Sequence, residues 1–313
     1  MIEPNVMNLL HFIEQFSDEV SCKSHMKKTR SKEGIICKKC QSKKHYWLKS
    51  KWMWQCSDCG FRTTLRSGIM MENSNLPIRT WSLAMAFMAY SKKGVFAAEL
   101  QRQFNHSRYT TLWSLMHRIR SAMGKRDDLY DLEDMIEFDE AYFAVATKAS
   151  DKQNLKKGRG SQKQSNVAVM AESVPLEDLT TGKQSKQCRY FKMNVLDTHK
   201  KEEVNALIGD NFEDTSIVFS DKSTSYVDIG NYVKVHITEK SNKQITITTL
   251  KWIHLVISNA KRTLLGIYHK IKGKYLQNYL DEFCYKLNRR YFGENLFDRL
   301  VIAVTHQYWY KRV

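Results

Sequence analysis

The spacing of apolar residues predicts a helical module over residues 77–126. Apolar side chains recur there every three or four residues, in stripes that begin after Pro77 and resume after Ser107, a suitable N-cap. Basic residues lie outside the last stripe, so the order is helix, short turn, basic helix. This order is typical of a helix-turn-helix, although an ordinary three-helix bundle gives the same pattern. The residues expected inside are Trp81, Met85, Met88, Phe96, Leu100, Phe104, Tyr109, Leu112, Met116, Ile119 and Met123, and those expected outside are Arg108, Arg118, Arg120 and Lys125.

Beyond residue 130 the apolar residues alternate with polar ones, which predicts strands. Ile136 and Phe138 alternate with Glu137 and Asp139, so the two acids lie on the face opposite the large apolar side chains. Further strands are expected over 166–174, 188–197 and 216–221, a basic loop over 148–165, and a helix over 273–292 whose core face is Leu276, Tyr279, Leu280, Phe283 and Leu287.

The strand expected over 216–221 ends in a single acid. Its sequence, SIVFSD, is typical of a buried strand that presents Asp221 at its carboxyl edge. Together with Asp139, this gives two carboxylates on strands of a basic chain. Such a pair suits divalent ions that activate a nucleophilic oxygen and stabilise the leaving oxygen of a phosphodiester. Because Asp is a hard oxygen ligand, Mg²⁺ or Mn²⁺ is expected; solvated acids at strand ends are the alternative.

Four of the seven cysteines form two CxxC pairs. Cys37 and Cys40 (CKKC) and Cys56 and Cys59 (CSDC) have the spacing of a tetrahedral zinc site on two knuckles of a β-ribbon. Four thiolates leave no open position, so we expect the zinc to be structural. The intervening KKHYWLKSKWMWQ interleaves basic and aromatic residues, and its tryptophans either grip DNA or form the small core of the ribbon. The remaining cysteines are expected to be buried thiols: Cys22, Cys188 and Cys284.

Charge and composition limit the partners. With 50 Lys and Arg against 33 Asp and Glu, the 313-residue chain carries a formal charge of +17, which favours nucleic acid over a merely solvated basic surface. The longest apolar run, LAMAFMAY, is far shorter than the roughly 20 residues of a membrane helix. The start of the chain lacks the pattern of a signal peptide. We therefore expect a cytoplasmic protein with no membrane partner.

Together these features resemble the zinc-ribbon, DDE-type transposases of bacterial insertion sequences, the group related to the eukaryotic Merlin transposons. The resemblance covers nearly the whole chain and is carried by the four cysteines, WSLAMAFMAYSKKGVFAAELQRQF with LWSLMHRIRSAM, IEFDEAYF, VFSD, and HLVISNAKRTLLGIYH followed by KYLQNYLDEFCYKLNRR. It implies an α+β multidomain fold in which an RNase H-like domain has a mixed sheet with flanking helices. The implied domains are an N-terminal helical segment (1–30), a zinc ribbon (31–70), a helix-turn-helix-like module (77–126), the catalytic domain (130–292) and a C-terminal tail (293–313).

The resemblance also implies the catalytic residues. Asp139 and Asp221 correspond to the first and second Asp of the family, His254 to the third ligand on a later helix, and Lys261 to a Lys seven residues beyond it. Glu is the commonest third ligand. A neutral imidazole offers one nitrogen and no charge, so it should bind Mg²⁺ less well and shift preference towards Mn²⁺. Alternatively, His254 is an ordinary helix histidine and Lys261 a solvated lysine. Two neighbours could supply the missing oxygen: Asn259 and Glu239.

The implied function is DNA transposition. The ribbon and helical module would recognise terminal inverted repeats in double-stranded DNA. The catalytic domain would hydrolyse one strand and use the freed 3′-hydroxyl to attack target DNA, both in-line phosphoryl transfers. Structural Zn²⁺, catalytic Mg²⁺ or Mn²⁺, and a homo-oligomer that synapses two ends follow from the same resemblance. Two alternatives are a catalytically inactive, domesticated zinc-ribbon regulator and a stand-alone structure-specific nuclease.

Overall fold

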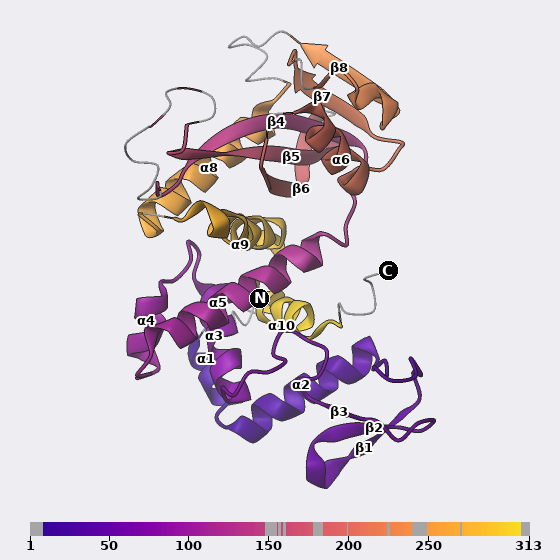
Figure 1. The fold of residues 1–313 in the computed structure, drawn as a ribbon, viewed down its shortest axis with the longest axis vertical. Helices are drawn as coiled ribbons and strands as arrows, with labels where there is room; N and C mark the ends of the chain where they lie inside the picture. Colours follow the sequence, from indigo (N-terminus) through magenta and orange to yellow (C-terminus); the bar gives the residue numbers. More distant parts are fainter. Residues whose placement is uncertain are drawn as a thin grey trace. The chain divides into compact units, whose positions relative to one another are not determined.

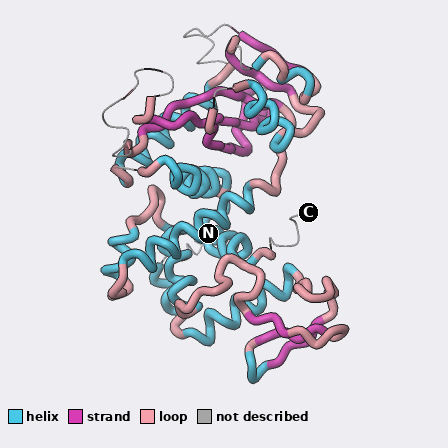
Figure 2. The backbone as a smooth tube through the Cα atoms, in the orientation of Figure 1, coloured by secondary structure: helices cyan, strands magenta, loops and turns pink. Residues whose placement is uncertain are grey.

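The computed structural model divides the chain into two compact units. The first comprises residues 1–126 and 289–313, and the second residues 127–288 (Figures 1 and 2). None of the described helices is long and apolar enough to cross a membrane. The expected basic loop at 148–165 falls mostly outside the described residues. The described residues are 9–147, 155, 158, 161–177, 184–198, 200–223, 226–239, 249–269 and 271–307.

Helices make up most of the first unit. Its centre is α3, in which Trp81, Met85 and Met88 are buried, as the apolar spacing predicts. The neighbouring helices α2 and α10 pack against α3. The helices of this unit are α1 (Leu9–Gln15), α2 (Glu19–Glu33), α3 (Ile78–Tyr90), α4 (Ala97–Gln103), α5 (Tyr109–Asp127, whose last residue belongs to the second unit) and α10 (Leu296–Thr305), with 3₁₀ turns η1 (Lys49–Lys51) and η6 (Arg290–Asn295).

Several expectations about this unit are wrong, among them the burial of Phe96, which is 45% exposed. Residues 296–305 are not a tail but form α10, because its apolar side chains, among them Phe297, Leu300 and Val304, recur at helical spacing and are buried. In α5, Arg120 is only 1% exposed whereas Tyr109 is 45% exposed. The middle of α5 is buried on nearly all sides, so a single apolar stripe does not describe it.

The ribbon is a three-stranded antiparallel sheet held by α2. Trp47 and Trp54 face each other across the first two strands, with ring centroids 4.7 Å apart. The buried guanidinium of Arg30 lies 5.2 Å from the Trp54 ring and donates to the carbonyls of Thr64 and Ser67. Trp54 therefore lies in the core of the ribbon, whereas Trp47 and Trp52 are half-buried. Its strands are β1 (His45–Leu48), β2 (Met53–Cys56) and β3 (Arg62–Thr64).

A five-stranded mixed sheet forms the second unit, in the order β6-β5-β4-β7-β8. The β4/β5 and β5/β6 pairs are antiparallel, and the β4/β7 and β7/β8 pairs are parallel. Helix α6 covers one face, and α8 and α9 cover the other (Figure 1). The elements are β4 (Met135–Ala144), β5 (Gln164–Glu177), β6 (Gln184–Leu196), α6 (Lys201–Asn211), β7 (Ile217–Asp221), η4 (Ile229–Asn231), β8 (Val235–Glu239), α8 (Lys251–Ile267), η5 (Gly273–Tyr275) and α9 (Leu276–Asn288).

Strand β4 lies in the middle of this sheet and contributes to two hydrophobic cores. Ile136 and Phe138 pack in the core under α6, whereas Ala141 and Phe143 pack in the core under α8 and α9. Since side chains alternate along a strand, Asp139 lies on the same face as Ala141 and Phe143. Glu137 and Asp139 therefore face the side of the sheet that α8 covers.

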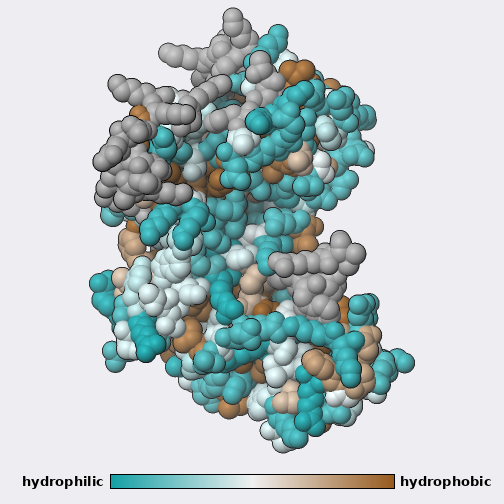
Figure 3. Space-filling view, in the orientation of Figure 1, coloured by the Kyte–Doolittle hydropathy of each residue, from teal (hydrophilic) through white to brown (hydrophobic). Residues whose placement is uncertain are grey.

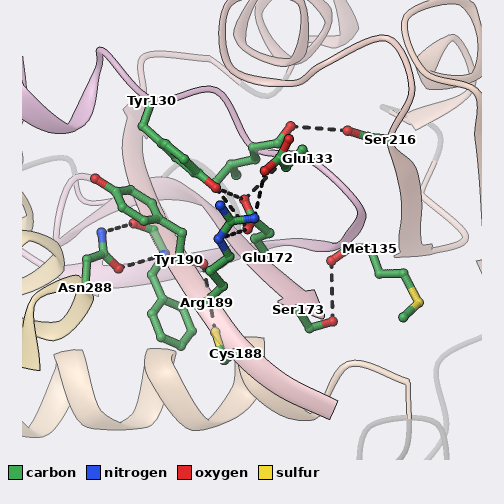
Figure 4. Close-up of polar contacts among 12 residues, drawn as sticks. Tyr130, Glu133, Met135, Glu172, Ser173, Cys188, Arg189, Tyr190, Ser216 and Asn288 are labelled. Atoms are coloured by element: carbon green, nitrogen blue, oxygen red, sulfur yellow. Dashed lines mark hydrogen bonds and ion pairs between the residues drawn. The ribbon is translucent and has the colours of Figure 1, made fainter. Parts of the chain in front are cut away.

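Buried polar contacts join strands β5 and β6 to the segments that enter and leave this unit (Figure 4). Glu172, fully buried on β5, accepts the hydroxyl of Tyr130 at 3.0 Å and pairs with Arg189 at 3.3 Å. Asn288, the last residue of the unit, bonds to both the N–H and the C=O of Phe191 and donates to Asp127, the first residue. These contacts tie the two ends of the unit to one another.

Candidate active site and zinc-binding ribbon

The four cysteines of the ribbon converge. The sulfur atoms of Cys37, Cys40, Cys56 and Cys59 all lie within 4.8 Å of one another. Four sulfurs bound to one Zn²⁺ at about 2.3 Å would lie about 3.8 Å apart, so the cluster fits a tetrahedral zinc ion.

The two halves of the cluster have the same local geometry. Each CxxC turn is followed by a residue with positive φ, Gln41 at 58° and Gly60 at 70°. The N–H of each of these residues donates to the carbonyl of the first cysteine of its pair, Cys37 or Cys56. Two matching turns therefore supply two sulfurs each. The other three cysteines, as expected, are buried and make no disulfide within the described residues: Cys22, Cys188 and Cys284.

Asp139 and Asp221 lie side by side on parallel strands. The last pair in their register is Phe138 of β4 with Ser220 of β7. Asp139 and Asp221 are the next residues of the two strands. Burial, and then the charges of Asp221 and Glu140, raise the pKa of Asp139 to about 6, although the N–H of Glu140 donates to its carboxylate at 2.8 Å. Two neighbouring carboxylates in a partly buried site repel each other, and a cation would relieve this repulsion.

Glu140 and Tyr226 extend this acidic group. The Tyr226 hydroxyl donates to Glu140 at 3.3 Å, and the side-chain amide of Asn166 donates to the same carboxylate. Burial, followed by the charges of Glu140, Asp139 and Asp221, raises the pKa of Tyr226 well above its ordinary value. Tyr226 therefore stays protonated and acts as a hydrogen-bond donor beside the aspartates.

Helix α8 carries the other two residues that the sequence singles out. His254 is half-buried in its first turn, and burial lowers the pKa of its imidazole, which favours the neutral form that binds metals. Lys261 is exposed, with Nζ 5.6 Å from the centre of the Phe143 ring. Asn259, one of the alternative oxygen donors, accepts a hydrogen bond from Arg262 at 2.7 Å.

Glu239, the other alternative donor, is in register with Asp221. It ends β8, the strand beside β7, and directly paired residues project from the same face of a sheet. Its carboxylate accepts the hydroxyl of Thr249, just before α8, at 3.1 Å. Across the described residues, only the ribbon cysteines bring three or more potential metal ligands into one tight group. Asp139, Asp221 and His254 do not form such a group.

Residues 131–288, half of the chain, match the model of the ISXO2-like transposase domain. The chain belongs to this transposase family. No similar protein was found among curated proteins. The Drosophila P element transposase strand transfer complex is a similar solved structure, at 13% sequence identity and a TM-score of 0.27, with 71% of this chain and 63% of that chain covered. This chain thus spans less than two thirds of that chain's length.

The matched region of the transposase coincides closely with its second unit, 127–288. It contains every acidic and basic residue that the resemblance implied, from Asp139 to Lys261. It also contains residues to which the sequence assigned no role, namely Glu137, Glu140 and Tyr226. The first two stand in the same acidic cluster of the sequence as Asp139. Tyr226 carries no such signal, because only the fold brings it to Glu140.

Proposed function

We propose that this transposase cleaves the ends of an insertion sequence and joins them to target DNA. The observation that carries the proposal is that the matched region, 131–288, contains two neighbouring parallel strands whose pairing stops one residue before Asp139 and Asp221. The strand order β6-β5-β4-β7-β8, with α6 on one face and α8 and α9 on the other, supports an RNase H-like catalytic domain over 130–292.

In this proposal Asp139, Asp221 and His254 hold Mg²⁺ or Mn²⁺. Oxygen donors suit both ions, and the neutral imidazole favours Mn²⁺. When bound, the divalent ions supply Lewis-acid activation of the attacking oxygen and neutralise charge on the phosphodiester. Lys261, exposed on the same helix as His254, contacts a DNA phosphate. Tyr226 holds Glu140 beside Asp139 through its hydroxyl.

The first unit is proposed to bind the terminal inverted repeats. Four exposed lysines of the ribbon, together with Tyr46 at 48% exposed, are available to DNA phosphates and sugars. Arg108 and Tyr109 are exposed where α5 begins, the part of a recognition helix that reads base edges. Hydrophilic residues predominate on the face shown in Figure 3. The ribbon lysines are Lys43, Lys44, Lys49 and Lys51.

The proposed setting is the cytoplasm of a bacterium, where the protein acts on chromosomal DNA. Joining both ends of one element requires that they be held together, so we propose a homo-oligomer in the complex with DNA. The structural zinc of the ribbon supports end recognition and takes no part in strand cleavage, because four thiolates fill its coordination shell.

The deciding experiment is movement of a marked element in cells. The element carries the flanking DNA of its own gene, and the wild type is compared with Asp139→Ala and His254→Ala. Excision and integration by the wild type, lost in both variants, support the transposase and its third ligand. Loss in Asp139→Ala alone assigns that ligand elsewhere. A wild type that binds the ends without moving them supports the regulator instead.

A second experiment measures how salt weakens binding to duplex DNA. If the protein neutralises about eight phosphates, log K falls with log salt at a slope near −7. A slope near zero would contradict DNA binding altogether. Because this measurement does not depend on cleavage, it separates loss of binding from loss of catalysis.

A further inference from the structure

The first turn of α8 has no cap of its own. Leu250 occupies the N-cap position and makes no side-chain cap hydrogen bond, and no acidic residue lies in the first turn. The backbone bond from the N–H of His254 to the carbonyl of Leu250 measures 3.3 Å. The N–H groups at the start of a helix have no partners within the helix, so a buried one needs an acceptor from elsewhere.

Glu137 supplies this acceptor from strand β4. Its carboxylate accepts the N–H of Ile253 at 3.0 Å, and the two residues are 116 positions apart in sequence. Both are buried, Glu137 at 3% exposed and Ile253 at 0%. Ile253 is the third residue of α8, one of the two positions that an N-cap side chain normally satisfies. A carboxylate there also interacts favourably with the helix dipole.

This hydrogen bond joins the two parts of the candidate active site. Glu137 stands two residues before Asp139 on the same face of β4, and His254 directly follows Ile253. The bond from Thr249 to Glu239 ties the segment before α8 to the neighbouring edge of the sheet. We propose that Glu137 is a positioning residue that fixes the first turn of α8, and with it His254, against the strand that carries Asp139. Its effect on catalysis rests on the proposed function.

The same device occurs in the first unit, where no catalytic residue is involved. Glu19 of α2 accepts the N–H groups of Ile78 and Arg79 at the start of α3, which also has no side-chain cap. Within the described residues, a glutamate from one element thus caps a helix of another at both α3 and α8. At α8 the capped turn carries His254, so a loose cap there would displace a proposed ligand.

Two substitutions distinguish the effect of the length of the Glu137 side chain from the effect of its charge. Glu137→Asp keeps the charge but shortens the side chain by one methylene, which withdraws the acceptor from Ile253. Glu137→Gln loses the charge but keeps an oxygen at the same reach. The matched control is Glu172→Asp, because Glu172 is a fully buried glutamate on the adjacent strand whose partners are Tyr130, Glu133 and Arg189 (Figure 4).

Hydrogen exchange of the full-length protein tests the anchoring. We expect Glu137→Asp to raise the exchange of amides 252–256 by at least about tenfold, whereas Glu137→Gln stays near wild type. Glu172→Asp should leave these amides unchanged. Unchanged exchange at 252–256 in Glu137→Asp would overturn the proposal, as would equal loosening by the Glu172 control.

Cleavage of a duplex that carries the flanking end of the gene, with Mn²⁺, tests the consequence. Glu137→Asp is expected to lower the single-turnover rate by at least about tenfold while duplex binding changes less than about twofold, and Glu137→Gln is expected to rescue it. The reverse order, with Gln inactive and Asp active, would show that charge rather than position matters and would overturn the inference. Absence of cleavage by the wild type refutes the proposed function, and the exchange measurement still decides the anchoring.

Discussion

The ribbon and the acidic site differ in how the chain assembles their ligands. The ribbon takes all four sulfurs from two short turns within 23 residues, Cys37 to Cys59, and they lie within 4.8 Å of one another. The ligands proposed for the acidic site, Asp139, Asp221 and His254, come from β4, β7 and α8 and are spread over more than a hundred residues. These three do not converge as the cysteines do.

This difference reflects whether metal binding or hydrophobic packing stabilises each region. The ribbon has only three short strands and a few tryptophans, so we expect zinc binding to contribute much of its folding free energy. The second unit has two extensive hydrophobic cores that hold its strands without metal. Its acidic group therefore does not need a bound metal ion to hold the surrounding fold together.

Loss of one cysteine should have the largest effect in the molecule. Cys56→Ser is expected to abolish stoichiometric zinc binding and unfold residues 31–70, since zinc contributes roughly 10–16 kcal/mol in small zinc domains. Zinc content and the fluorescence of Trp47, Trp52 and Trp54 measure this. Cys22→Ala, a buried thiol outside the cluster, is the control and should retain zinc. Full zinc content in Cys56→Ser would contradict a four-cysteine site.

A substitution in the acidic site should do the opposite, with activity lost and the fold kept. Asp139→Asn is expected to lower single-turnover cleavage by at least about 10³-fold, or about 4 kcal/mol of transition-state stabilisation, because it removes a proposed metal ligand. Circular dichroism should show an unchanged fold. Asp134→Asn, an exposed acid at positive φ that Asn tolerates, is the control. Comparable activity in both variants would remove Asp139 from the site.

The contrast also explains what the sequence could predict. Cys37 and Cys40 can be predicted as ligands from the sequence because both lie in one turn. Asp221 can be predicted as a site residue because it ends an apolar strand. Helix α10 has a visible apolar pattern in Phe297, Leu300 and Val304, but the family resemblance implied only a tail there. The hydrogen bond from Ile253 to Glu137 has no sequence signal, because it depends on how β4 and α8 pack.

The identity of the third metal ligand proposed for the acidic site can be tested directly. If His254 binds the ion directly, His254→Ala should weaken Mn²⁺ binding by roughly 10–100-fold, and Glu239→Gln should have a smaller effect. If Glu239 provides the oxygen, the order reverses. Mn²⁺ titration followed by electron paramagnetic resonance measures both affinities. Asn259→Ala tests the other alternative oxygen donor and should leave the affinity unchanged, since its side-chain oxygen accepts a hydrogen bond from Arg262. Equal, unchanged affinities would exclude both residues as ligands.

A carboxylate buried away from both metal sites should show what burial does without a cation. Asp281 of α9 accepts a hydrogen bond from Gln277 at 2.8 Å, yet burial, and then the charges of Asp128 and Asp127, raise its pKa to about 7. From about pH 4 to pH 7 the folded protein holds a proton that the unfolded chain has lost. The contribution of Asp281 to the free energy of unfolding therefore falls as the pH rises from about 4 to 7.

Asp281→Asn removes this titration and keeps an oxygen for Gln277. Relative to wild type, the variant should gain about 1–2 kcal/mol of unfolding free energy between pH 5 and pH 8, less than a full shift implies because neighbouring groups relax. Urea unfolding across this range measures the difference, and Asp210→Asn, exposed on α6, is the control. A pH-independent difference would show that Asp281 does not titrate there. A pH-dependent gain would show that, in this unit, a buried carboxylate without a cation weakens the fold.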